Sequence, residues 1–100
     1  MTDTPYLVQA DPLVLPLVPG YLANRSAELP KLDAALAAKD FKMLRKVGHN
    51  MRGSAGAYGL PPLSEIGARI EDAAQKQDTA ALAPALDDMR RFLQSVKVPP

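Results

Sequence analysis

The chain has no cysteine, no tryptophan and a single histidine, and aromatic side chains make up only 5% of its 100 residues. Without cysteine, a disulfide scaffold, a zinc finger and an iron–sulfur site are excluded. Long apolar runs are also missing, because proline and polar residues interrupt each one well before the roughly 20 residues that a membrane span needs. Asp3 and Asp11 stand where a signal peptide would carry basic residues. These absences favour a cytoplasmic protein.

β-Branched residues are scarce as well, since Val, Ile and Thr together supply 11 residues against 16 Ala and 14 Leu. Ala and Leu favour helices, whereas β-branched side chains favour strands, so the composition indicates an all-α fold. The proportions of 47% hydrophobic and 23% charged residues are typical of a globular chain rather than a disordered one. A chain of this length forms one domain with a modest core.

The N-terminal part of the chain divides into two segments. We expect residues 1–10 to form a flexible lead-in, because they show no apolar period. The domain is expected to span residues 11–98, beginning with Asp11 as an N-cap and Pro12 at the first helical position. The domain begins with a short helical segment that is apolar from Leu13 to Val18. We expect this segment to cap the domain, although docking of a partner is an alternative.

Apolar spacing and helix-ending residues predict four longer helices. Their expected limits are about 21–38, 40–58, 62–76 and 78–96. Asp40 and Asp78 are suited to cap the second and fourth helices. Pro30 is expected to kink the first helix, and Pro84 to disturb the early turns of the fourth. Short connections favour antiparallel neighbours, so the predicted fold is an antiparallel up-down four-helix bundle.

The predicted second helix carries the histidine, His49. At about 100° per residue, one group of apolar side chains gathers on the opposite side of this helix: Leu44, Val47, Met51, Ala55 and Tyr58. Four basic residues gather around the histidine instead: Lys42, Arg45, Lys46 and Arg52. No acidic residue occurs between Phe41 and Ser64, so these cations lack the acidic partners typical of a solvated helix face.

Glycines also lie on the histidine side of this helix. Gly53 and Gly56 stand in mid-helix, where each costs about 1 kcal/mol relative to Ala. Their missing side chains would leave space beside the imidazole, although Gly56 could instead serve close helix packing. In the third helix, Gly67 stands among apolar residues and is expected to pack closely against a neighbouring helix.

This arrangement suits covalent phosphorylation of His49. A neutral imidazole nitrogen is a competent nucleophile, and nearby cations disfavour the imidazolium form. After transfer, the four cations could offset the roughly two negative charges of the phosphoryl group. A metal role is not expected, because the chain has no second His, no Cys and no expected carboxylate on that face. No catalytic base or nucleotide loop accompanies His49, so we predict a phosphoryl carrier without a cofactor rather than an enzyme.

The segment from His49 to Gly59 resembles the histidine phosphotransfer (HPt) domain of bacterial two-component phosphorelays. That family places a hydrophobic residue, a cation, a glycine and two small residues after the histidine, with another glycine ten residues after it. Here these positions hold Met51, Arg52, Gly53, Ser54 with Ala55, and Gly59. Ile70 to Ala73 is similar to the Leu-Glu-x-Ala segment of the family's third helix. The resemblance covers about residues 11–97.

The resemblance implies a four-helix bundle in which His49 is the exposed phospho-acceptor, Arg52 contacts or attracts the phosphoryl group and Gly53 gives access to it. The implied partners are a response-regulator receiver domain, a hybrid sensor histidine kinase, or both, and the receiver supplies Mg²⁺. Gly48 replaces the Ala that is common before the histidine, and we expect it to loosen the helix there. The chain is expected to be a monomer with no nucleic-acid or membrane partner.

Other interpretations of His49 stay open. A docking module of the same fold would bind receiver or other signalling domains without carrying phosphate. A phosphatase-like accessory protein would need a carboxamide or carboxylate in place of His49. A solvated histidine without a role would leave the two glycines and the surrounding cations unexplained.

Overall fold

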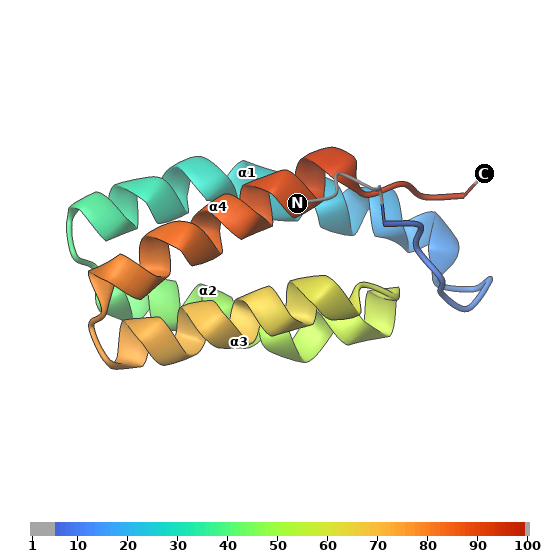
Figure 1. Cartoon of the computed structure of the whole chain (residues 1–100). Helices are drawn as coiled ribbons and strands as arrows, with labels where there is room; N and C mark the ends of the chain where they lie inside the picture. The colour runs from blue at the N-terminus through green and yellow to red at the C-terminus, as the bar shows by residue number, and fades with distance from the viewer. Residues whose placement is uncertain (1–5, 100) are drawn as a thin grey trace.

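The computed structural model describes residues 6–99, which form four long helices and two short 3₁₀ segments (Figure 1). In chain order these are η1 (Leu15–Leu17), α1 (Val18–Ala37), α2 (Phe41–Ser54), η2 (Ala55–Tyr58), α3 (Pro61–Gln75) and α4 (Thr79–Ser95). The all-helical prediction is therefore confirmed. Each long helix packs against two others, and α2 with α3 makes the most extensive contact. The site described below lies on that pair.

Two of the three predicted aspartate caps, Asp40 and Asp78, are present. The expectation that Asp11 caps a helix beginning at Pro12 is wrong, because residues 12–14 form a turn and η1 begins only at Leu15, after Val14. The side chain of Asp40 accepts a hydrogen bond from Met43 N at the start of α2, and that of Asp78 accepts one from Ala81 N at the start of α4. These bonds satisfy amide groups that the first turn of a helix leaves without a partner in the backbone. The caps therefore fix where the two helices begin.

Neither interior proline ends the helix that contains it, and the kink expected at Pro30 stays a prediction. α1 continues through Pro30 and α4 continues through Pro84. Pro19 lies in the first turn of α1, where its missing amide hydrogen costs nothing, so this helix starts before the predicted Tyr21. α1 and α4 pack against each other, and such tertiary contacts supply most of the stability of helices in proteins.

The core receives side chains from every long helix. Fully or nearly fully buried large side chains are Val8, Val18, Leu32, Leu44, Met51, Leu60, Leu63, Ile70, Leu82, Leu86 and Met89. Within residues 6–99 no polar or charged residue is buried. The core therefore depends on apolar packing, and the charged groups of the site lie at its surface.

The expectation of a loose lead-in does not hold for residues 6–10. Val8 is buried, its amide donates to Lys97 O over 2.9 Å, and the amide of Lys97 donates to Tyr6 O over 2.8 Å. Tyr6 and Val8 alternate with polar or exposed neighbours, a two-residue period that suits an extended segment lying on the bundle. The rest of the predicted lead-in, residues 1–5, lies outside the described residues.

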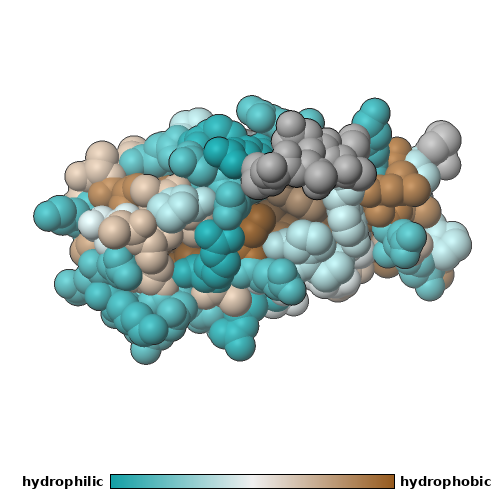
Figure 2. All heavy atoms as spheres, viewed as in Figure 1, coloured by the Kyte–Doolittle hydropathy of each residue, from teal (hydrophilic) through white to brown (hydrophobic). Residues whose placement is uncertain are grey.

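The apolar segment from Leu13 to Val18, which ends at the first residue of α1, caps the bundle only in part. Val18 is fully buried, but the side chains of Leu13 and Leu17 stay exposed, at 85% and 59%. Figure 2 shows apolar groups gathered at the end of the molecule where η1 lies. Across residues 6–99, no helix combines the length and apolar character needed to cross a membrane.

The second helix ends earlier than predicted. α2 stops at Ser54, and the following Ala55–Tyr58 segment is a 3₁₀ turn closed by Gly59, whose φ of 75° lies in the left-handed region. The ring of Tyr58 stacks on that of Tyr21 with centroids 4.2 Å apart. The hydroxyl groups of Tyr21 and Ser54 share a hydrogen bond of 2.7 Å. These contacts hold the end of α2 against α1.

Candidate functional site

His49 lies on the exposed face of α2, as its position in the sequence predicts. Its side chain is 69% exposed, whereas Leu44 and Met51 are fully buried in the same helix. The apolar stripe anchors α2 in the core and thereby directs the imidazole toward solvent. A partner protein can therefore reach the ring without any rearrangement of the bundle.

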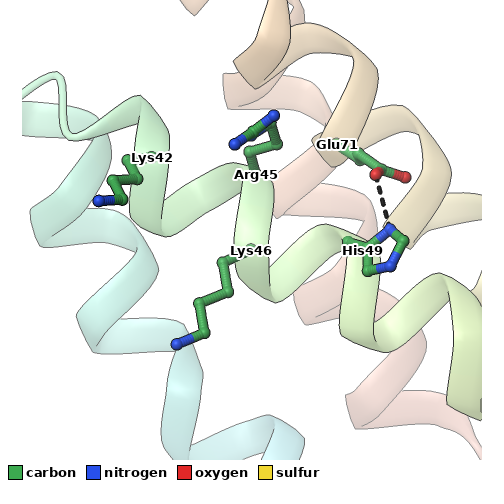
Figure 3. Close-up of a pocket in the computed structure, with 5 residues that line it drawn as sticks. All are labelled: Lys42, Arg45, Lys46, His49 and Glu71. Atoms are coloured by element: carbon green, nitrogen blue, oxygen red, sulfur yellow. Dashed lines mark hydrogen bonds and ion pairs between the residues drawn. The ribbon is translucent and has the colours of Figure 1, made fainter.

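A single carboxylate connects His49 with Arg52. Glu71, from α3, places Oε2 2.8 Å from His49 Nδ1 and Oε1 2.9 Å from Arg52 Nη1. Its side chain is 18% exposed, against 69% for His49 and 60% for Arg52. Figure 3 shows Glu71 reaching from α3 to the imidazole on α2. The site therefore spans two helices.

The expectation that no carboxylate lies near His49 is wrong. Glu71 is separated from His49 by 22 positions in sequence, and only the packing of α3 on α2 brings the two together. The sequence of α2 alone could not predict the contact between Glu71 and His49, since that helix has no acidic residue. The resemblance of Ile70 to Ala73 to a family segment was the available signal, but it assigned Glu71 no role.

The hydrogen bonds at Glu71 determine which imidazole nitrogen is available. Bonds from Arg52 and then from His49 hold the pKa of Glu71 below its usual value of 4.5. An ionised carboxylate only accepts hydrogen bonds, so Nδ1 must carry the proton. In the neutral ring the lone pair then resides on Nε2, which lies on the side of the ring away from Glu71 (Figure 3).

This lowered pKa predicts an acid-dependent loss of stability. A carboxyl with a lower pKa in the folded state stabilises the fold above its unfolded pKa, and the contribution disappears as pH falls through the folded pKa. We expect wild type to be more stable than Glu71→Gln at pH 7, with the difference shrinking as pH falls below about 4.5. Urea unfolding of both proteins from pH 7 to pH 3 measures this. A difference that is constant across that range would contradict the assignment.

The other predicted cations surround the site more loosely. Lys42, Arg45 and Lys46 line a surface hollow of about 400 Å³ together with His49 and Glu71. Figure 3 shows the ammonium groups of both lysines directed away from the imidazole. Arg52 is thus the predicted cation that hydrogen bonds connect to His49, through Glu71. In the described part of the chain, no cluster of three or more His, Cys, Asp or Glu could hold a metal ion.

The glycines of the site divide into two pairs. A Cβ added at Gly53 or Gly56 would meet no atom within 4 Å, so both positions face open space, although Gly56 lies in η2 rather than in α2. A Cβ at Gly48 or Gly67 would meet the backbone of the opposite helix at less than 3 Å. The packing role predicted for Gly67 is confirmed. Gly48 permits close contact with α3 as well, while the loosening of α2 expected there stays a prediction.

Comparison with known families agrees with this geometry. A model of the Hpt domain matches residues 20–98, which include the whole of α2, α3 and α4. The chain belongs to the Hpt domain family. Comparison with curated proteins and with solved structures gave no significant match. Hpt domains act in phosphotransfer and interact with receiver domains and kinases.

Proposed function

We propose that this Hpt domain is a phosphorelay carrier in which His49 accepts a phosphoryl group from the aspartyl phosphate of a receiver domain and passes it to another receiver. The observation that carries the proposal is the orientation of one exposed imidazole. Its Nδ1 lies 2.8 Å from the carboxylate of Glu71. Nε2 lies on the other side of the ring, and the His49 side chain as a whole is 69% exposed. A nucleophile held in this way is oriented for in-line attack.

The proposed transfer needs no base on this chain, because no proton has to leave His49. The lone pair of Nε2 forms a bond to phosphorus as the bond from the aspartyl oxygen to phosphorus breaks, and the electron pair of that bond returns to the aspartyl carboxylate. The proton on Nδ1 stays in its hydrogen bond with Glu71, whose negative charge stabilises the positive charge that develops on the ring. Reversing the step on a second receiver completes the relay.

The wider setting is also a proposal. The chain is a carrier rather than an autonomous kinase, and it binds no cofactor. Mg²⁺ in the partner receiver would supply charge neutralisation for the aspartyl phosphate. We propose an antiparallel up-down bundle that acts as a monomer in the bacterial cytoplasm, with a receiver domain or hybrid sensor histidine kinase as partner. The short connections between packed helices support that topology.

Transfer from a labelled receiver tests the proposal against its alternative. Several receiver domains carrying labelled aspartyl phosphate are mixed with the protein and Mg²⁺, and a gel follows the label. The proposal predicts label on this chain that is stable in base and labile in acid, as a phosphohistidine is. Binding of a receiver without transfer, with the protein folded, would favour the docking module instead.

Arg52 is expected to support the transfer electrostatically. Hydrogen bonds to charged groups contribute about 1.5–3 kcal/mol, so Arg52→Gln should slow transfer to His49 by about tenfold or more. Arg69→Gln is a matched control, because Arg69 also pairs with a carboxylate across two helices, at Asp88 over 2.8 Å, but outside the site. Equal rates for the two variants in the receiver assay would show that Arg52 has no role in transfer.

A further inference from the structure

The two helices that carry the site touch through their backbones at a pair of glycines. A Cβ built on Gly48 of α2 would lie 2.8 Å from Gly67 O and 2.6 Å from Glu71 N. A Cβ built on Gly67 of α3 would lie 2.8 Å from Gly48 O and 2.6 Å from Arg52 N. Real side chains do not make contacts this short, so the helices could not approach as closely with any other residue at these positions.

This contact lies directly beside the hydrogen-bonded groups. Gly48 precedes His49 in the chain and packs on the backbone of Glu71, while Gly67 packs on the backbone of Arg52. The hydroxyl of Ser64, near the start of α3, donates to Arg52 O over 2.7 Å and adds a further connection. The backbones that carry the imidazole, the guanidinium and the carboxylate are therefore held at a separation that the glycines permit.

We propose that Gly48 and Gly67 are positioning residues, which hold α3 close enough for Glu71 to keep the proton of His49 on Nδ1. A glycine has no side chain with which to contact the imidazole or a phosphoryl group, so both glycines act through Glu71. The geometry of the two helices supports the proposed effect of the glycines on the position of the imidazole proton. Its consequence for transfer rests on the proposed function.

The proton position can be measured without any phosphoryl donor. His49 is the only histidine, so ¹⁵N NMR of the side chain reports one ring and distinguishes a proton on Nδ1 from one on Nε2. The variants are Gly48→Ala and Gly67→Ala, which add the same methyl group from opposite helices. Gly20→Ala in α1 is the matched control, because its Cβ would meet nothing within 4 Å.

We expect wild type and Gly20→Ala to hold the neutral ring with its proton on Nδ1. In Gly48→Ala and Gly67→Ala the helices must separate, and the population should shift toward a proton on Nε2, the form that an unpartnered imidazole prefers in water. If either folded variant keeps the wild-type proton distribution, the proposal is overturned.

A shorter acidic side chain at position 71 tests whether the separation of α2 and α3 limits the hydrogen bond, if the alanine variants fail to fold. Glu71→Asp keeps the charge and leaves the glycine contact intact, but it shortens the reach of the carboxylate by one methylene group. The proposal predicts a shift toward the Nε2 proton in this variant too. An unchanged proton distribution in folded Glu71→Asp would overturn it, because the helix separation would then not limit the bond.

Phosphorylation by phosphoramidate, a small donor that releases ammonia, gives the functional readout. A displacement of about 1 Å can cost up to about a hundredfold in rate, so we expect at least about a tenfold slower reaction in folded Gly48→Ala than in Gly20→Ala. An equal rate would contradict a positioning role in transfer. If wild type itself takes no phosphoryl group from phosphoramidate or receivers, the proposed function fails, while the NMR result still decides the role of the glycines at His49.

Discussion

Replacing His49 by Gln is expected to abolish phosphoryl transfer to this chain and to leave the fold intact. The imidazole is 69% exposed, so its loss removes little packing, and a surface substitution costs within about 0.5 kcal/mol. Gln can still donate a hydrogen bond to Glu71, but its side chain has no nucleophilic nitrogen. The measurement is the gel assay with a labelled receiver and Mg²⁺, with circular dichroism to confirm helicity.

The control for this variant is Arg69→Gln, which removes a charged side chain that is 48% exposed and lies outside the site. We expect it to accept label at the wild-type rate. Label remaining on folded His49→Gln would place the acceptor on another residue. Equal loss of label in both variants would point to a general effect of surface substitution rather than to His49.

Replacing Leu44 by Ala is expected to have the largest effect on stability. Leu44 is fully buried on the side of α2 away from His49. Removing a buried leucine side chain costs about 2–5 kcal/mol, because apolar burial is lost and a cavity remains. Small domains have a total stability of about 5–15 kcal/mol, so this loss is a large share of it. Urea unfolding followed by circular dichroism measures the difference.

Leu13→Ala supplies the matched comparison, since the same atoms are removed from a side chain that is 85% exposed. We expect its stability to lie within about 0.5 kcal/mol of wild type. If Leu44→Ala were as mild as Leu13→Ala, α2 would not be anchored through this residue. The orientation of His49 would then need another explanation.

Features determined by nearby residues could be predicted from the sequence. Asp40 and Asp78 each cap a helix as expected, since capping depends on an amide three residues away. The exposure of His49 followed from the apolar stripe of its own helix. The phosphotransfer interpretation rested on this local pattern and on the resemblance of the segment around His49.

Features determined by contacts between distant segments could not be predicted in this way. Glu71 joins the site only because α3 packs on α2, and the helix period of α2 contains no information about α3. Gly48 looks like a weak point within its own helix, but it permits close contact of that helix with its neighbour. The segment of residues 6–10 pairs with Lys97, near the other end of the chain.

The most direct test of the account is to identify which nitrogen carries the phosphoryl group. The ¹⁵N-labelled protein is phosphorylated by a receiver domain with Mg²⁺, and NMR measures coupling between phosphorus and the two imidazole nitrogens. The account predicts coupling to Nε2 of His49, with the proton on Nδ1 still bonded to Glu71. Coupling to Nδ1, or a phosphoryl group on any other residue, would contradict it.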